Sequence, residues 1–185
     1  MYARVTGKRS CLTAGPITPY IDGYVLPKSF DDACLDGSLA DVPYMIGFTL
    51  NDAGNMAGQI TDFCLNREEV GNKAWAYQFA RPLPDDGSHP QDYLKGAFHS
   101  SDLWFVFKSL KHCWRPWTQG DWDLSEKMLT AWSNFAKYSD PNGANGGDWK
   151  PYTKENQQFM RFKLNEQDAE DSSLGEPLKA EQRTH

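Results

Sequence analysis

The stretch VPYMIGFTLNDAG, residues 42–54, decides the fold class of this chain of 185 residues. Residues 42–49 form a compact apolar run without polar alternation, which is typical of a parallel strand buried on both faces. The run ends at a turn, Asn51 to Gly54. A second such run, AWAYQF at residues 74–79, ends at the Pro-rich loop of residues 81–87. The sequence therefore predicts an α/β fold with a mostly parallel sheet and flanking helices.

Two further segments have the pattern of helices. Residues 29–36 predict a short helix with Ser29 as N-cap and Gly37 after its end. Residues 124–138 predict the longest helix, and its core-facing residues are Met128, Trp132 and Phe135.

The ends of the chain differ from its centre in composition. Residues 1–15 have no periodic apolar pattern, and residues 165–185 are polar and rich in Asp and Glu. We therefore expect a mobile leader and a mobile tail around one folded region, residues 16–164.

Composition excludes several classes of protein. The net charge is −6 and no basic run exceeds Lys8-Arg9, so nucleic acid is not an expected partner. The sequence has no apolar run long enough for a membrane span and no hydrophobic leader, so the default compartment is the cytoplasm, unless an upstream export signal exists. The cysteines lack CxxC spacing, which favours small buried thiols over two disulfides; they are Cys11, Cys34, Cys64 and Cys113.

Two ionisable residues follow the predicted strands. Asp52 comes directly after the first strand, and His99 lies in a loop beyond the second. Ligands bind at the carboxyl ends of strands in open parallel sheets, so chemistry is expected at these positions. After His99 the apolar spacing predicts a helix; its apolar residues are Leu103, Val106, Phe107 and Leu110.

Three segments carry a resemblance to one known family. They are PYMIGFTLNDAG at residues 43–54, GAFHSSDLWFVF at residues 96–107 and WSNFAKYSDPN at residues 132–142. They are similar to the C-terminal third of the type B carboxylesterases, which include the cholinesterases. IDGYVLP at residues 21–27 resembles the segment before the acid strand in that family. The most specific of these segments is the Gly-x-x-His loop, which opens a helix and has an acidic residue three positions after the histidine.

The resemblance implies the C-terminal part of an α/β-hydrolase sheet, incomplete without the N-terminal portion. It implies a serine esterase whose substrate is a small-molecule carboxylic ester, with His99 as general base and Asp52 as triad acid. The order of acid before histidine is the one that this fold uses. The family usually has Glu at the position of Asp52. No metal or organic cofactor is implied.

The chain departs from the family in two respects. It contains no Gly-x-Ser-x-Gly motif, so the resemblance implies that the nucleophile and the oxyanion donors come from elsewhere. An N-terminal esterase fragment is therefore a candidate partner. The family also has a longer helical segment between the acid strand and the strand of residues 74–79, and its loss would open part of the substrate site.

Alternative readings exist for each candidate residue. Asp52 is also explained as a turn-forming residue, and Asp102 as a dipole partner or structural hydrogen-bonding group in the first turn of a helix. Ser100 is explained as a helix N-cap rather than a nucleophile.

Three functional hypotheses remain at this stage. The first is the histidine-and-acid region of a serine esterase, and the second is a non-catalytic, esterase-like binding or scaffold protein. The third is a self-sufficient small hydrolase, for which the sequence offers no activated nucleophile.

Overall fold

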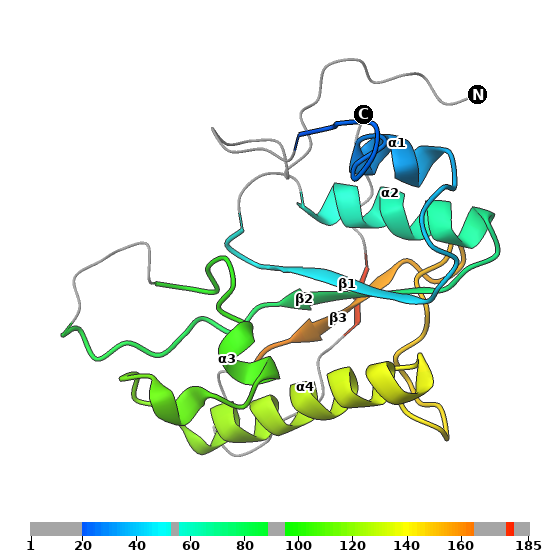
Figure 1. The fold of residues 1–185 in the computed structure, drawn as a ribbon. Helices are drawn as coiled ribbons and strands as arrows, with labels where there is room; N and C mark the ends of the chain where they lie inside the picture. Colours follow the sequence, from blue (N-terminus) through cyan, green and yellow to red (C-terminus); the bar gives the residue numbers. More distant parts are fainter. Residues whose placement is uncertain (1–19, 53–55, 89–94, 165–176, 180–185) are drawn as a thin grey trace. The chain divides into compact units, whose positions relative to one another are not determined.

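The computed structural model describes residues 20–52, 56–88, 95–164 and 177–179. The chain divides into two units, residues 1–41 and residues 42–185. The first unit contains helix α1 (Phe30–Leu35; Figure 1). The helix begins after Ser29, whose side chain accepts a hydrogen bond from the Asp32 amide. Gly37 follows the helix with a φ of +72°, a conformation that glycine adopts without strain. The predicted short helix and its cap are confirmed.

The second unit is built on a sheet with strand order β1-β2-β3-β4. β1 pairs with β2 and β2 with β3 in parallel, whereas β3 and β4 are antiparallel. The strands are β1 (Tyr44–Thr49), β2 (Ala74–Phe79), β3 (Gln158–Phe162) and β4 (Pro177–Lys179). The α/β fold with a parallel sheet is therefore confirmed.

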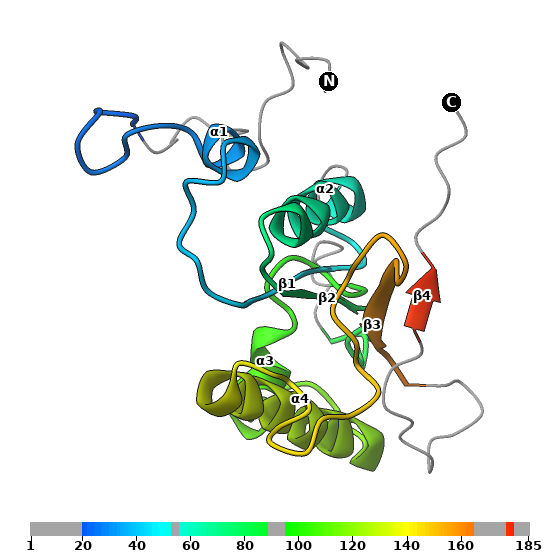
Figure 2. The same ribbon diagram turned by 90° about the vertical axis from the view of Figure 1, so that its right-hand side faces the viewer.

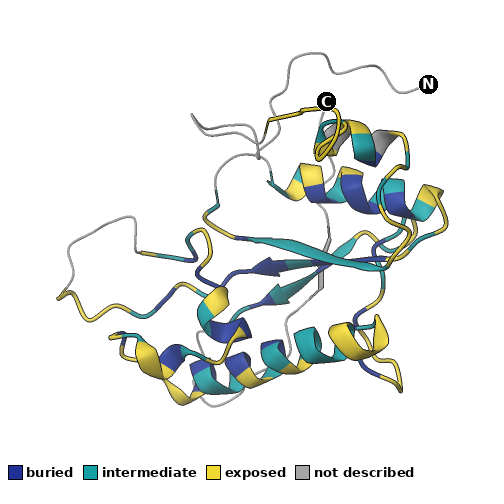
Figure 3. Cartoon of the chain, viewed as in Figure 1, coloured by how far each residue is buried: buried dark blue, intermediate teal, exposed yellow. Residues whose placement is uncertain are grey.

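Burial differs between the two predicted strands. β2 is buried along nearly its whole length, as expected for a strand with neighbours on both sides (Figure 3). The prediction that the first strand is buried on both faces is wrong for most of β1, because only Thr49 is buried and the other residues are half-buried. In the described part of the sheet, β1 is the edge strand and has a hydrogen-bonded neighbour on one side only.

Helices cover both faces of this sheet. Helix α2 (Met56–Glu69) lies on one face, and α3 (Leu103–Val106) and α4 (Gln119–Tyr138) lie on the other (Figures 1 and 2). Tyr44 of β1 makes an edge contact with Phe63 of α2, with ring centroids 5.2 Å apart. Tyr77 of β2 contacts Trp132 of α4 at 4.9 Å. Aromatic residues of the two strands thus contact the helices on opposite faces of the sheet.

Helix α4 begins earlier than the sequence pattern predicts. The Thr118 side chain accepts from the Asp121 amide, and the Asp121 carboxylate accepts from the Thr118 amide, so the two residues form a capping box. The apolar periodicity starts only at Leu124, which is why the predicted start is late. The C-terminal end matches the prediction, since Ser139 adopts a left-handed φ of +56° there.

The predicted helix after His99 is mostly absent. Only α3, of four residues, forms, and a short 3₁₀ helix, η3 (Leu110–His112), follows it. Lys108 has a φ of +51°, which ends the helical path between them. The N-cap interpretation of Ser100 is also wrong, because Ser100 has a φ of +68° and α3 begins after Asp102.

The two predicted terminal segments lie largely outside the described residues. The leader, residues 1–15, is wholly outside them, as is most of the tail, residues 165–185. The described part of that tail is β4, which pairs with β3.

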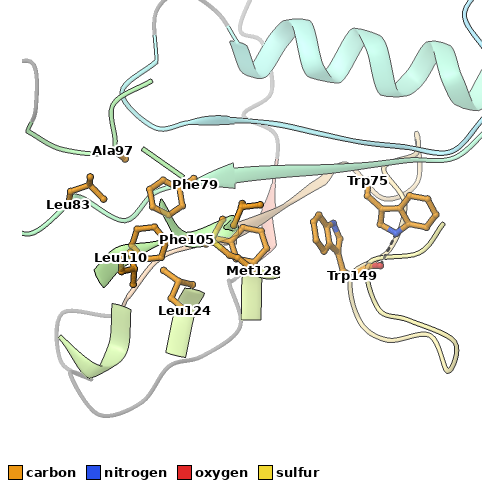
Figure 4. Close-up of a cluster of buried hydrophobic side chains, with 11 residues drawn as sticks. Trp75, Phe79, Leu83, Ala97, Phe105, Leu110, Leu124, Met128 and Trp149 are labelled. Carbon is orange, nitrogen blue, oxygen red and sulfur yellow. Dashed lines mark hydrogen bonds between the residues drawn. The ribbon is translucent and has the colours of Figure 1, made fainter. Parts of the chain in front are cut away.

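The main core lies between the sheet and α4. It contains Trp75 and Phe79 of β2, Phe105 of α3 and Met128 of α4, all buried (Figure 4). The Trp75 indole donates to the Trp149 carbonyl at 3.2 Å. The core face predicted for the long helix is confirmed. Its members are Met128, which is buried, and Trp132 and Phe135, which pack against the cluster.

The cysteines in the described residues agree with the thiol prediction. Cys34 and Cys64 are buried and Cys113 is half-buried. Burial raises the pKa of the Cys64 thiol to about 12. Cys11 lies outside the described residues.

Candidate active site

Asp52 stands directly beyond the carboxyl end of β1. Its amide donates to the Thr49 carbonyl at 3.0 Å, and the Thr49 hydroxyl donates to Asp52 Oδ2 at 3.3 Å. The Asp52 side chain is only 15% exposed. A turn from Thr49 to Asp52 therefore holds a carboxylate at the strand end, and the second half of the predicted turn of residues 51–54 lies outside the described residues.

The histidine reaches the same edge of the sheet by a longer route. After β2 the chain runs through the Pro-rich loop and returns at Gly96, whose carbonyl accepts from the Leu83 amide at 3.0 Å. Ala97 is fully buried in the core, where Figure 4 shows it beside Leu83 and Phe79. Two residues later, the His99 side chain is 79% exposed. Ala97 therefore anchors the loop in the core, and the imidazole of His99 is open to solvent.

These two side chains form a hydrogen-bonded pair. His99 Nδ1 lies 3.1 Å from Asp52 Oδ1 and 3.3 Å from Asp52 Oδ2. A carboxylate can only accept, so this contact favours the tautomer with the proton on Nδ1. Nε2 is then the basic nitrogen, on a ring that solvent or a reactant can reach.

Asp102 has a different hydrogen-bond partner from Asp52. It is buried, and its Oδ2 accepts from the Tyr77 hydroxyl at 3.2 Å. Burial raises the pKa of the Asp102 carboxyl, and the hydrogen bond from Tyr77 opposes that effect. Burial also raises the pKa of Tyr77, with the charge of Asp102 as a second cause. This geometry matches the structural hydrogen-bonding interpretation of Asp102.

An open apolar hollow adjoins His99. Its volume is about 350 Å³, and its lining consists of Phe98, His99, Ser100, Leu103, Trp104, Phe107 and Ser109. Phe107 is 71% exposed and Leu103 is also exposed. The sequence pattern gave both residues helical spacing in one continuous helix, but the helix that forms has only four residues.

Two residues that hold the site's carboxylates were not predicted. Thr49 supports Asp52, and Tyr77 supports Asp102. Both are members of apolar strand runs, where a hydroxyl is easily taken for packing. The Tyr77 contact spans 25 positions in the sequence, so no local pattern could have marked it.

Other classes of site are not found in the described ranges. Within them, no group of three or more His, Cys, Asp or Glu side chains is arranged to hold a metal ion. No helix among those residues is long and apolar enough to cross a membrane.

Comparisons with known proteins give carboxylesterases and related esterases. The sequence model of the Carboxylesterase family matches residues 57–182. The chain is 32% identical to Acetylcholinesterase-1 of Trittame loki over 54% of its length, and 33% identical to Bile salt-activated lipase of Homo sapiens over 49%. A solved esterase of Clostridium hathewayi aligns with a TM-score of 0.48 and 23% identity, over 58% of this chain and 21% of that one.

The matches cover only a small part of each relative. The matched segments are 17% of the length of the Trittame loki protein and 12% of the human one. The family range begins at residue 57, so it contains His99 but not Asp52. The pairing of Asp52 with His99 therefore stands on the geometry.

Proposed function

The chain belongs to the carboxylesterase family, and from this premise we propose that it is the region of a carboxylic ester hydrolase that supplies the catalytic histidine and acid. The observation that carries the proposal is the contact of 3.1 Å between His99 Nδ1 and Asp52 Oδ1. It joins an exposed imidazole to a largely buried carboxylate at the carboxyl edge of a parallel sheet. That edge is where ligands bind in folds of this type.

In this proposal His99 is the general base. Nε2 takes the proton from a serine hydroxyl as its oxygen attacks the ester carbonyl, and later returns that proton to the leaving alkoxide. The Asp52 carboxylate accepts the Nδ1 proton, keeps the ring in the useful tautomer and stabilises the imidazolium when it forms. Asp52 has one methylene fewer than the Glu usual in the family. The short turn from Thr49 to Asp52 supports a carboxylate of that length, because it holds Asp52 close to the strand end.

The nucleophile is proposed to come from sequence outside these 185 residues, because they contain no Gly-x-Ser-x-Gly motif. The ester is a small molecule, and a polypeptide that carries the nucleophile elbow is the expected partner. The proposed chemistry involves only side chains and a serine ester intermediate, and no cofactor takes part in it.

The direct test is turnover of a p-nitrophenyl ester. We expect the purified chain alone to give no turnover above buffer, and the complete reading frame, or a mixture with the segment that bears the nucleophile elbow, to hydrolyse the ester. Turnover by the chain alone that disappears in a His99→Ala variant would instead favour a self-sufficient small hydrolase.

The roles of the two carboxylates can be separated in the active form. His99→Ala is expected to lower kcat by about 10⁴-fold or more, since triad members act as a unit. Asp52→Asn is expected to lower kcat by about 10⁴-fold through the wrong tautomer. Asp102→Asn is the matched control, expected to change stability more than kcat. The reverse order of effects for the two Asp variants would make Asp102 the acid.

A non-catalytic binding or scaffold role is the alternative, and the missing nucleophile motif is the observation that favours it. If no adjacent or upstream reading frame encodes a Gly-x-Ser-x-Gly elbow, and no mixture restores turnover, this alternative replaces the enzyme proposal.

A further inference from the structure

We infer that Asn51 is a positioning residue that clamps the histidine loop onto the acid turn and thereby sets the contact between His99 and Asp52. The inference deepens the proposed function, because it concerns how the catalytic pair is held. Its structural part can be tested whether or not the chain takes part in ester hydrolysis.

The clamp is a reciprocal pair of hydrogen bonds between Asn51 and Ala97. The Asn51 amide donates to the Ala97 carbonyl at 2.9 Å, and the Asn51 side-chain Oδ1 accepts from the Ala97 amide at 2.9 Å. Asn51 thus binds both the backbone amide and the backbone carbonyl of Ala97, which fixes the position and the orientation of Ala97. Asn51 is one residue before Asp52, and Ala97 is two residues before His99.

Gly96 shows how closely the two segments approach. A Cβ at Gly96 would lie 2.5 Å from Asn51 Oδ1, and Gly96 has a φ of +75°. Both features exclude an ordinary side chain there without a shift. The glycine of the Gly-x-x-His motif therefore has a physical role, since it admits the asparagine side chain to the Ala97 amide.

Relative strengths indicate which contact positions the other. The His99 ring is 79% exposed, so water competes for its hydrogen bonds and its contact with Asp52 is a weak restraint on the loop. The two hydrogen bonds between Asn51 and Ala97, next to the buried Ala97 side chain, are the stronger restraint. The clamp therefore holds the loop, and the His99–Asp52 contact follows from it.

A measurement of the His99 tautomer in the chain itself tests this. The ¹⁵N shifts of the two ring nitrogens, read by NMR at alkaline pH where imidazole is neutral, report which nitrogen carries the proton. Asp52→Ala gives the reference values for a broken pair. We expect Asn51→Ala to move both shifts most of the way to those values, and Asn51→Asp, which keeps the Oδ acceptor, to stay near wild type.

Asn156→Ala is the matched control. The Asn156 side chain also holds a loop in place, because it donates a hydrogen bond to the Pro151 carbonyl at 2.9 Å. Asn156 lies just before the amino end of β3, whereas Asp52 follows the carboxyl end of β1. Because the strands are parallel, the two residues are at opposite ends of the sheet. We expect Asn156→Ala to lower the urea midpoint of unfolding without moving the His99 shifts.

One result would overturn the inference: an Asn51→Ala protein with a native circular dichroism spectrum and wild-type His99 ring shifts. If Asn51→Ala fails to fold, Gly96→Ala presses on Oδ1 from the other side and is expected to shift the same two nitrogens. Unchanged shifts in a folded Gly96→Ala protein would equally refute the clamp.

An activity measurement then tests the link to catalysis. In the complete esterase, Asn51→Ala is expected to lower kcat by about 10²-fold, the usual effect of a small misplacement, with little change in KM and partial rescue in Asn51→Asp. If the tautomer shifts but no form of the protein turns over ester, the clamp stands and the proposed function fails. If kcat falls without a tautomer change, the clamp fails.

Discussion

Replacing Asp121 with alanine is expected to lower the free energy of unfolding by about 4 kcal/mol. The Asp121 side chain is 0% exposed and accepts from Arg81 Nε at 2.7 Å and from Arg81 Nη2 at 3.1 Å. It also accepts from the Thr118 amide and hydroxyl, each at 2.9 Å. One carboxylate thus joins the loop after β2 to the start of α4.

The magnitude follows from two losses. Breaking a buried ion pair costs about 3–5 kcal/mol, and Arg81, whose side chain is 19% exposed, can recover some hydration, which favours about 3 kcal/mol. Loss of the capping box adds about 1 kcal/mol. Urea denaturation followed by tryptophan fluorescence measures the sum, which corresponds to a midpoint shift of about 2 M at an m-value of about 2 kcal/mol/M.

A double-mutant cycle separates the ion pair from the cap. Arg81→Met removes the pair but leaves Thr118 and Asp121 in place, and in the Asp121→Ala/Arg81→Met protein no charge is left unpaired. We expect the double variant to be more stable than the sum of the two single effects predicts. A loss below about 1 kcal/mol for Asp121→Ala, in the range typical of an exposed pair, would refute the argument.

Three further outcomes follow from burial and close packing. Gly47→Ala is expected to lower stability by about 1–3 kcal/mol in the same urea assay, because the new Cβ would meet the Tyr77 ring, and an unchanged midpoint would contradict this contact. Since burial raises the pKa of Asp102 above 3.8, its proton stabilises the fold fully below about pH 4 and less as the pH rises through the folded value. Urea midpoints measured upward from pH 4 should therefore fall relative to those of Asp102→Asn, and parallel curves would count against the raised pKa. Cys64, with a pKa of about 12 from burial, should resist a thiol reagent in the folded protein while half-buried Cys113 reacts first, and equal labelling rates would show that α2 opens.

The local elements of this chain follow from its sequence where one physical effect dominates. β2 occupies residues 74–79 as predicted, because an apolar run this short, between a turn and a Pro-rich loop, has the length of a strand rather than of a helix. The cap at Ser29 follows equally, since a short hydroxyl side chain satisfies a free amide of its own helix. These interactions lie within a few residues of one another.

The sequence by itself thus determined the α/β class, the family resemblance and the choice of His99 and Asp52 as candidates. Only the tertiary structure decided that these side chains lie 3.1 Å apart, across 47 positions of sequence. It also decided that the segment after His99 forms a four-residue helix with Phe107 exposed, and that Asn51 holds Ala97. The physical reason is that sheet register and buried anchors such as Ala97 set these contacts, and they depend on segments brought together only when the parallel strands pair.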